Sequence, residues 1–443
     1  MEILDGLVEA VIFRSEDSGY VVAKITANKE VVTIVGIMPL LKEGQQIEVK
    51  GNWITHKQFG RQFNVEEYKE LLPTSVKEIE KGSILIENGI IKEINPNTTS
   101  SDSVIDCKGL YVAPGFIDIH IHGAGGYDTM DGTFDAINEI SKTICKYGTT
   151  SFTPTTMTMS AEDILKSMTA IKKAKLEGTD GAQVLGAHLE GPFISPNAIG
   201  AQNPNYLIKP TFENFESMTG DAMDSVVSIT MAPEVDGAKE LASILTEKGI
   251  RCSIGHTKAT YEEAIEGIKC GFCHSTHLFN AMTGFTHREP GVVGATFDTD
   301  ITTETISDGI HISYPSLRIA YKQKGTDKTL LVTDAMCACG MPDGNYALGG
   351  QPVIVKDGSA RLENGALAGS ILTLNKAIKN IYENTDYPLY EIVKMASFNG
   401  AKYCRVDDKK GQIKENFDAD LVLFDDNIDI KMTIVNGKIV YSS

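Results

Sequence analysis

Histidine and carboxylate residues recur along the chain at positions that suit the binding of a divalent metal ion. His120 and His122 are separated by one residue, and in a strand such residues point to the same face. Farther along, Glu190, His256 and His277 each follow a short apolar segment. Imidazole nitrogens and carboxylate oxygens together suit borderline ions such as Zn²⁺, Fe²⁺ or Mn²⁺. We therefore expect these residues to share a metal site.

A further carboxylate, Asp334, follows the apolar segment Leu330-Leu331-Val332. A bound divalent ion lowers the pKa of water to about 7, which provides a hydroxide nucleophile at neutral pH. Hydrolysis by such a hydroxide also needs a proton carrier, because a poor leaving group departs only when it is protonated. One carboxylate can take the proton of the water and pass it to the leaving group. We predict that Asp334 has this role as general base and acid.

The elements that must position these residues alternate along the chain. From about residue 111 to 335, apolar strands alternate with helical segments, which is typical of βα units around a parallel sheet. Eight such units close into a (β/α)8 TIM barrel, whose active site lies at the carboxyl ends of the strands. The eight predicted strands end near His122, Pro154, Glu190, Pro233, His256, His277, His311 and Asp334.

Further segments at both ends of the chain are predicted to be β-structure. Residues 1–81 contain β-branched runs separated by glycine and asparagine, which predicts a small all-β module. A hairpin is expected around Asn88-Gly89, since this pair favours a tight turn between strands. The predicted domains are 1–81 for the module, 113–349 and 364–404 for the barrel, and 82–112, 350–363 and 405–443 for a small β-sandwich.

Composition excludes several classes of protein. The chain has 443 residues, of which 42% are hydrophobic and 23% charged, and these values exclude a disordered or collagen-like chain. Acidic residues outnumber basic ones by 59 to 41, so we expect no nucleic-acid partner. No apolar run has the length of a membrane span, and Glu2, Asp5 and Glu9 stand where a signal peptide needs positive charge. We expect a cytoplasmic protein without a membrane partner.

Eight motifs follow one another after residue 83, namely PGFIDIHIHG, HLEGPFI, IGHT, THLFNAM, REPGVVGA, SDGIH, LVTDAM and LAGS. Over about four fifths of the chain, the sequence resembles the N-acetylglucosamine-6-phosphate deacetylases of the amidohydrolase superfamily. The resemblance implies a metal-dependent barrel that hydrolyses the acetamide of N-acetyl-D-glucosamine 6-phosphate to D-glucosamine 6-phosphate and acetate. It also implies a homodimer.

The resemblance implies a role for each matched residue. Glu190, His256 and His277 match the metal ligands shared by the family, whereas His120 and His122 match a pair that binds a second ion in some members. One or two ions of Zn, Fe, Mn or Co are therefore expected per subunit, with Asp334 as the catalytic acid and base. The matched substrate contacts are Ala201, Gln202, Asn280, Ala281, Arg288, His311, Leu367, Ala368 and Gly369.

Two of these contacts have chemistry that can be argued from the side chain. Arg288 suits the phosphate, because a planar guanidinium binds two oxygens at once. Gln202 stands where many members carry histidine; it can donate a hydrogen bond to a sugar or carbonyl oxygen but carries no charge. Rate or specificity is therefore expected to differ from that of the histidine-bearing members.

The first 80 residues resemble a different family. Gly19-Tyr20-Val21-Val22, Gly51-Asn52-Trp53 and Phe59-Gly60-Arg61-Gln62-Phe63 are similar to the N-terminal OB-like domain of RecD-like DNA helicases. The chain contains no Gly-x-x-x-x-Gly-Lys-Ser/Thr phosphate loop. The resemblance implies a fusion, joined near residues 80–83, in which the module replaces one strand of the sandwich.

Two alternatives stay open at this point. The first is another amidohydrolase, such as an N-acyl-amino-acid deacetylase, which would have no need for both Arg288 and His311. The second is a nucleic-acid-binding module fused to an impaired barrel, and the retained ligand residues argue against it.

Overall fold

The computed structural model describes residues 2–15, 18–27, 30–39, 41, 46–57, 59–71, 82–96 and 103–443. The chain divides into two compact units, residues 1–77 and 78–443. Residues 80 and 81 of the predicted junction near residues 80–83 lie outside the described part.

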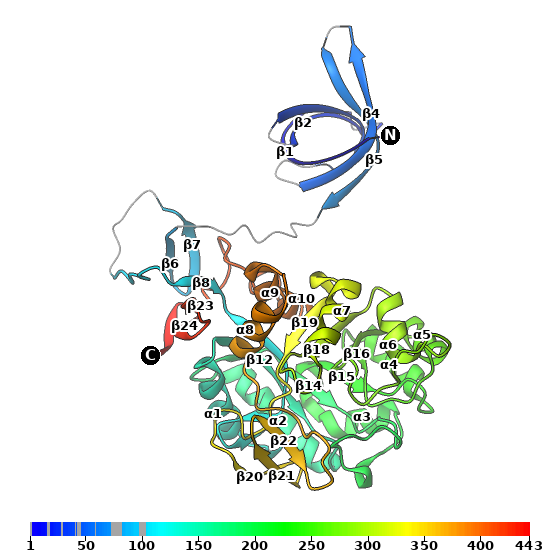
Figure 1. The fold of residues 1–443 in the computed structure, drawn as a ribbon, viewed down its shortest axis with the longest axis vertical. Helices are drawn as coiled ribbons and strands as arrows, with labels where there is room; N and C mark the ends of the chain where they lie inside the picture. Colours follow the sequence, from blue (N-terminus) through cyan, green and yellow to red (C-terminus); the bar gives the residue numbers. More distant parts are fainter. Residues whose placement is uncertain are drawn as a thin grey trace. The chain divides into compact units, whose positions relative to one another are not determined.

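The first unit is a closed five-stranded barrel with the strand order β1-β2-β3-β5-β4 (Figure 1). In β2 every second residue is buried, and Val21, Ile25, Ile34 and Phe63 are fully shielded in the interior. This alternation is the pattern of a strand with one face on a core. The predicted small OB-like module is thus confirmed. Its strands are β1 (Glu2–Arg14), β2 (Tyr20–Ala27), β3 (Glu30–Ile37), β4 (Gln46–His56) and β5 (Gly60–Leu71).

The second unit is built on eight parallel strands that confirm the predicted TIM barrel. Seven neighbouring pairs form ladders, and β19 approaches β9 through a parallel bridge between Ile121 and Ala335. The backbone N–H of Asp334 donates to the carbonyl of His120 at 2.9 Å, which adds to this closure. The strands are β9 (Phe116–Ile121), β12 (Thr149–Thr156), β14 (Ala187–Glu190), β15 (Val226–Met231), β16 (Arg251–Ile254), β17 (Phe272–Ser275), β18 (Thr302–Ile306) and β19 (Thr329–Val332).

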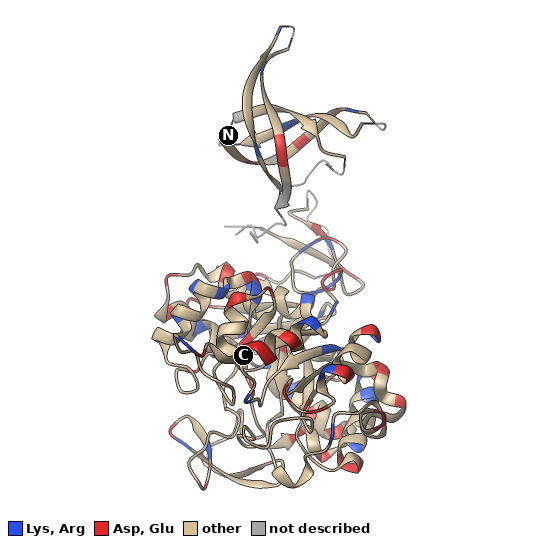
Figure 2. Ribbon diagram, turned by 90° about the vertical axis from the view of Figure 1, so that its right-hand side faces the viewer, with Lys and Arg blue, Asp and Glu red and all other residues tan. Residues whose placement is uncertain are grey.

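Helices cover the outside of this barrel, and acidic and basic residues are interspersed along them (Figure 2). Several begin at a hydroxyl residue that accepts a hydrogen bond from the first turn, as Thr133, Ser160 and Thr260 do. In the described part of the chain, no helix combines the length and apolarity that crossing a membrane requires. The helices are α1 (Phe134–Cys145), α2 (Ala161–Glu177), α3 (Phe212–Thr219), α4 (Ala238–Glu247), α5 (Tyr261–Lys269), α6 (Gly291–Asp298), α7 (Tyr314–Lys324), α8 (Leu374–Asn384), α9 (Leu389–Ala396) and α10 (Phe398–Tyr403).

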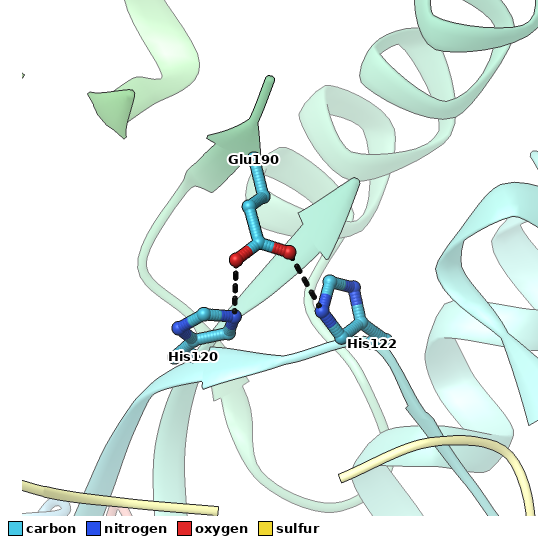
Figure 3. A group of neighbouring side chains, drawn as sticks. All are labelled: His120, His122 and Glu190. Atoms are coloured by element: carbon cyan, nitrogen blue, oxygen red, sulfur yellow. Dashed lines mark ion pairs between the residues drawn. The ribbon is translucent and has the colours of Figure 1, made fainter. Parts of the chain in front are cut away.

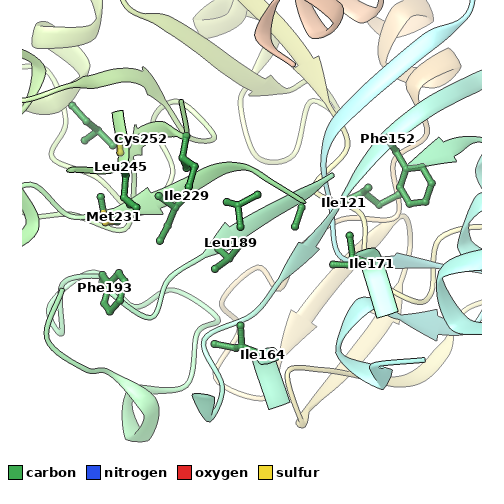
Figure 4. Packing of buried hydrophobic residues seen from close by; sticks show 14 of the residues in the cluster. Ile121, Phe152, Ile164, Ile171, Leu189, Phe193, Ile229, Met231, Leu245 and Cys252 are labelled. Atoms are coloured by element: carbon green, nitrogen blue, oxygen red, sulfur yellow. The ribbon is translucent and has the colours of Figure 1, made fainter. Parts of the chain in front are cut away.

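The apolar core lies between the strands and the helices, as Figure 4 shows for part of it. Leu189 of β14 packs in this cluster with residues of α2 such as Ile164 and Ile171. Successive side chains of a strand point to opposite faces. The residues on either side of Leu189, which are His188 and Glu190, therefore face the barrel interior, and the same alternation that builds the core presents polar groups inside.

Smaller sheets accompany the barrel. β8 (Tyr111–Pro114), β23 (Leu421–Phe424), β24 (Ile430–Val435) and β25 (Lys438–Ser442) form one sheet in the order β25-β24-β23-β8. The hairpin of β6 (Ile84–Glu87) and β7 (Ile90–Ile94) shares an apolar cluster with it. Asn88 and Gly89 form the hairpin turn with positive φ angles of 53° and 82°.

The segment at 350–363 lies elsewhere than its predicted place in the sandwich. It forms β21 (Gln351–Lys356) and β22 (Ser359–Leu362), which pair with β20 (Gly344–Leu348) in a separate three-stranded sheet. The turn residues were sufficient to predict the hairpin itself. Its sheet partner is β20, the strand that follows β19 in sequence, and not a strand of the sandwich. The remaining short strands are β10 (Gly123–Ala124), β11 (Tyr127–Asp128) and β13 (Gln183–Val184).

Candidate metal centre

The structure brings the six predicted metal and acid–base residues together at the carboxyl ends of the barrel strands. Each is at most 8% exposed. His120 lies in β9 and His122 directly follows it, while Glu190 is the last residue of β14. The other three, His256, His277 and Asp334, each lie two residues beyond the end of β16, β17 or β19.

These last three residues share an uncommon backbone conformation. The φ angles of His256, His277 and Asp334 are 47°, 30° and 48°, in the left-handed region that side chains with a Cβ disfavour. A strained residue of this kind costs about 1–3 kcal/mol and persists only where the surrounding structure dictates it. The recurrence of the same conformation at three strand ends indicates that the placement of these side chains is under tight geometric constraint.

Glu190 is the central residue of the group. Its Oε1 lies 3.1 Å from Nε2 of His256 and 3.0 Å from Nε2 of His277. On the other side its carboxylate faces the β9 pair, with Oε1 3.6 Å from Nε2 of His120 and Oε2 3.2 Å from Nε2 of His122 (Figure 3). One carboxylate therefore stands between two pairs of imidazoles.

Asp334 faces the same centre from β19. Its Oδ1 lies 3.3 Å from Nε2 of His122 and 3.6 Å from Nε2 of His120. The two carboxylates thus approach the β9 histidines from different strands. This position allows Asp334 to exchange a proton with a group bound between them.

All four histidines are oriented in the same way. Each points Nε2 toward the centre and has its Nδ1 within hydrogen-bond distance of an acceptor outside it. The acceptor of His120 is Glu304 at 2.5 Å. For the other three it is a backbone carbonyl, namely Thr155 at 3.2 Å for His122, Ala198 at 3.0 Å for His256 and Asn280 at 3.1 Å for His277. A proton held on Nδ1 leaves the Nε2 lone pair free, which is how metal-binding histidines are prepared.

This donor set fits one or two divalent cations. His120, His122 and Glu190 form one group, and Glu190, His256 and His277 form another, with the ligand atoms of each group within 4.8 Å of one another. The fully buried Nε2 of His120 has no hydrogen-bond partner although it points at the centre. A buried polar atom without a partner is costly, so its presence here favours a ligand role.

The charges of the centre shift the pKa values of its members. Burial would raise the pKa of Glu190, but the charges of His120 and His256 hold it well below its usual range. Burial would lower the pKa of His122, yet hydrogen bonds to Asp334 and Glu190 raise it to about 9. Since cations compete with protons for imidazole nitrogen, metal binding at this pair is expected to weaken as the pH falls.

Burial shifts the pKa values of two groups beside the centre in the direction that favours their neutral forms. Burial and the nearby charge of His120 lower the pKa of His188 to about 3. Its Nε2 lies 2.8 Å from the hydroxyl of Thr230. Burial raises the pKa of Asp118 to about 7, although it accepts a 2.6 Å hydrogen bond from Thr333, the residue before Asp334.

Gln202, one of the predicted substrate contacts, lies directly beside Glu190. It is buried, and its Nε2 donates to Oε2 of Glu190 at 2.6 Å while its Oε1 accepts from the backbone N–H of Thr158 at 2.7 Å. Its amide therefore orients the carboxylate at the centre of the site. The neighbouring Ala201 is partly buried, and its carbonyl accepts a hydrogen bond from Gln351 of β21.

The loop of Leu367, Ala368 and Gly369 lies against Asp334. Ser370, the next residue, donates its backbone N–H to the carbonyl of Asp334 at 2.7 Å. A Cβ on Gly369 would lie 2.9 Å from that same carbonyl, so a glycine is needed for the loop to approach so closely. The predicted substrate loop and the predicted acid–base residue are thus directly connected.

The other predicted substrate contacts lie at varying distances from this network. Asn280 and Ala281 follow His277 in one turn, where the side-chain amide of Asn280 donates to the carbonyl of Leu278 at 3.1 Å. In the part of the chain that the structure describes, neither Arg288 nor His311 contacts the candidate metal ligands. Arg288 is exposed and forms no ion pair with Glu289 there, and His311 is paired with Asp308 at 2.7 Å.

Glu304 is the residue that the sequence did not single out. It lies in β18 among threonine and isoleucine residues and is 1% exposed. Burial would raise its pKa, but the charge of His120 and hydrogen bonds from His120 and His274 hold it well below its usual range. The available signal was an acidic residue inside a predicted buried strand, which by itself does not reveal a partner.

Comparison with known proteins agrees with both resemblances. The amidohydrolase family profile matches residues 111–440, and the profile of the OB-fold domain of the ATP-dependent DNA helicase YrrC matches residues 1–73. The N-acetylglucosamine-6-phosphate deacetylase of Lysinibacillus sphaericus is 40% identical over 336 residues, which cover 76% of this chain and 87% of the relative.

Solved structures give the same result. The N-acetylglucosamine-6-phosphate deacetylase of Pasteurella multocida has a TM-score of 0.77 at 31% identity and covers 85% of this chain and 96% of its own. A mutant of the Mycobacterium smegmatis deacetylase in complex with N-acetyl-D-glucosamine-6-phosphate has a TM-score of 0.76 at 28% identity, covering 82% and 95%. The family match over residues 111–440 and these relatives confirm the expectation from the eight motifs: the chain belongs to the amidohydrolase family.

Proposed function

We propose that the second unit removes acetate from N-acetyl-D-glucosamine 6-phosphate and produces D-glucosamine 6-phosphate. The observation that carries the proposal is the convergence of Glu190, His256, His277 and Asp334 at the carboxyl face of a barrel related to such deacetylases. The relative in complex with N-acetyl-D-glucosamine-6-phosphate supports the choice of substrate.

The four histidines and Glu190 would hold the metal. Glu190, His256 and His277 would bind one ion of Zn, Fe, Mn or Co, and His120 and His122 would bind a second that shares Glu190. Such an ion lowers the pKa of a water ligand to about 7 and polarises a carbonyl oxygen. The buried Nδ1 contacts of the histidines keep every Nε2 directed at the centre, so the ligands need little reorganisation when they bind.

Asp334 is proposed to move the proton. Its Oδ1 faces the space between the β9 histidines, 3.3 Å from His122. The carboxylate accepts a proton from the attacking water and then donates it to the amide nitrogen, so that glucosamine 6-phosphate leaves as the amine and acetate remains. The hydrogen bond from Ser370 to the carbonyl of Asp334 holds this residue against the proposed substrate loop, Leu367–Gly369.

Arg288 and His311 are proposed to recognise the phosphate. Arg288 is exposed on the segment before α6, which leaves its guanidinium available to two phosphate oxygens. Asp308 holds Nδ1 of His311 at 2.7 Å and thereby leaves its other ring nitrogen available to a ligand. We further propose that Asn280, Ala281 and Ala201 contact the sugar, and that the enzyme acts as a homodimer.

The test is acetate release from four substrates with the metal content measured on the same sample. The proposal expects release from N-acetylglucosamine 6-phosphate, with one or two ions per chain and weak activity on unphosphorylated N-acetylglucosamine. Faster release from the 4-epimer, N-acetylgalactosamine 6-phosphate, would make that sugar phosphate the substrate in place of the proposed one. Faster release from an N-acetyl amino acid would contradict the proposal, and light scattering on the same sample reports the oligomeric state.

A further inference from the structure

Glu304 is a carboxylate of β18 in the interior of the barrel. None of the sequence motifs assigns it a role. It is 1% exposed, and its nearest strand neighbours Thr303 and Thr305 are fully buried. An ionised carboxylate at such depth is stable only when hydrogen bonds and opposite charges replace its water. The identity of those donors therefore indicates what the residue does.

Its two oxygens have different partners. Oε1 lies 2.5 Å from Nδ1 of His120 and accepts a 3.0 Å hydrogen bond from the backbone N–H of His277. Oε2 lies 3.2 Å from Nε2 of His274, whose Nδ1 lies 2.7 Å from the hydroxyl of Thr302. The Glu304 carboxylate thus contacts the side chain of one candidate ligand, His120, and the backbone of another, His277.

The contact with His120 is unlike those of the other candidate ligands. His122, His256 and His277 each face a neutral backbone carbonyl with Nδ1, whereas His120 faces a charged carboxylate. A carboxylate fixes the Nδ1–H tautomer and also increases the basicity of the opposite nitrogen. That opposite nitrogen, Nε2 of His120, is the buried atom that lacks a hydrogen-bond partner.

We propose that Glu304 is a positioning residue that acts through His120 to strengthen metal binding by the group His120, His122 and Glu190. The inference rests on the proposed metal centre but not on the identity of the substrate. Glu304 does not reach the centre itself, since His120 stands between them with Nδ1 toward Glu304 and Nε2 toward the centre. Its effect on the group Glu190, His256 and His277 is expected to be small, because its contact there is to the backbone of His277.

The experiment measures metal affinity in Glu304→Gln by competition of Zn²⁺ with a chromophoric chelator, on full-length protein. Glutamine keeps the size of the side chain but lacks the charge and has one acceptor oxygen in place of two. Removal of such a partner of a metal ligand typically reduces affinity about 10- to 100-fold. We expect that loss for the ion bound by His120 and His122, together with a changed absorption spectrum of the Co²⁺-loaded protein.

A double-mutant comparison separates this role from a general structural one. In His120→Ala, which retains only the group Glu190, His256 and His277, the further change Glu304→Gln should leave the remaining affinity unaltered. An affinity loss of equal size in that background would show that Glu304 acts through His277 or the fold, and would overturn the proposal. Unchanged metal affinity in the single variant Glu304→Gln would also overturn the proposal, whether the protein binds one ion or two.

Two further variants guard against misfolding. Thr305→Val alters the same strand and removes a hydroxyl that lies 3.1 Å from that of Tyr321, so it should keep its metal affinity. Glu304→Asp replaces the glutamine variant if that variant does not fold. It retains the charge but withdraws it by one methylene from His120, so a smaller loss of metal affinity is expected. Full metal affinity in this variant would count against the proposal. Metal affinities that follow these expectations without acetate release would refute the proposed substrate and leave this inference intact.

Discussion

The two units of the chain are both closed barrels, yet their interiors hold opposite kinds of side chain. The five-stranded barrel is filled by residues such as Val21, Ile34 and Phe63, all fully buried. The carboxyl end of the eight-stranded barrel instead buries Glu190 and His120 at 2% and 0% exposure. Because a buried charge costs several kcal/mol unless it is paired, such a cluster weakens a fold that apolar residues would stabilise. The first interior is organised for stability and the second for chemistry.

The largest effect is expected from removing one charge of the second interior. Asp334→Asn keeps the size of the side chain, and asparagine tolerates the left-handed φ of 48° at this position. The variant should fold and retain metal while kcat for acetate release falls by about 10²- to 10⁴-fold, since asparagine cannot carry the proton. A kcat near that of the wild type would refute the assigned role.

In the first interior, Phe63→Ala should affect stability alone. Removal of a buried phenylalanine costs about 3–5 kcal/mol. Trp53, the single tryptophan of the chain, has its ring 5.3 Å from that of Phe63, so its fluorescence follows the unfolding of this unit. The fluorescence transition should move to lower urea concentration while kcat and metal content stay unchanged. A parallel loss of activity would show that the two units depend on each other.

A smaller effect is expected for the proposed phosphate contact. Arg288→Ala removes an exposed guanidinium, for which the lower end of the range for a hydrogen bond to a charged group, about 1.5 kcal/mol, is appropriate. The value of kcat/KM for N-acetylglucosamine 6-phosphate should fall roughly tenfold, with little change for the unphosphorylated sugar. Equal losses on both substrates would assign Arg288 a structural role.

The smallest effect, none at all, is expected when single-stranded DNA is added. Nucleic-acid-binding OB domains need a basic groove with stacking aromatic residues. Residues 1–81 carry ten Lys and Arg against thirteen Asp and Glu, and Arg61 already lies over the ring of Trp53 at 4.0 Å. A fluorescein-labelled oligonucleotide at low salt should show no anisotropy change with the full-length protein. Binding of the oligonucleotide at micromolar protein would show that the first unit has a nucleic-acid-binding function of its own.

Local sequence was sufficient to predict the barrel strands and most of the residues at their ends, although β18 ends at Ile306, five residues before the predicted end near His311. His120 and His122 are identified by their spacing together with the PGFID segment that precedes them, and Glu190 by its place at the end of an apolar run. The alternation of strands and helices then brings such ends to one face. The hairpin at Asn88-Gly89 was predictable for a similar reason, because the two turn residues are adjacent in sequence.

The parts that could not be predicted depend on residues far apart in the chain. Glu304 has a role only through His120, which is 184 positions away. The hydrogen bond from Gln202 to Glu190 could not be predicted either, because it depends on how the fold places the two side chains. The segment at 350–363 was correctly assigned to strands, yet nothing within it specifies that β21 pairs with β20 rather than with the sandwich.

The left-handed backbone at His256, His277 and Asp334 determines which substitutions can be interpreted at this centre. An alanine placed at any of them would keep a conformational cost of about 1–2 kcal/mol without the local hydrogen bonding by which a polar side chain offsets it, and would also lose the functional group. An alanine scan would therefore overstate the chemical contribution of these residues relative to His120 and His122, whose φ angles are ordinary. Asparagine, which visits this conformation readily, is the appropriate replacement at all three positions and makes their measured effects comparable.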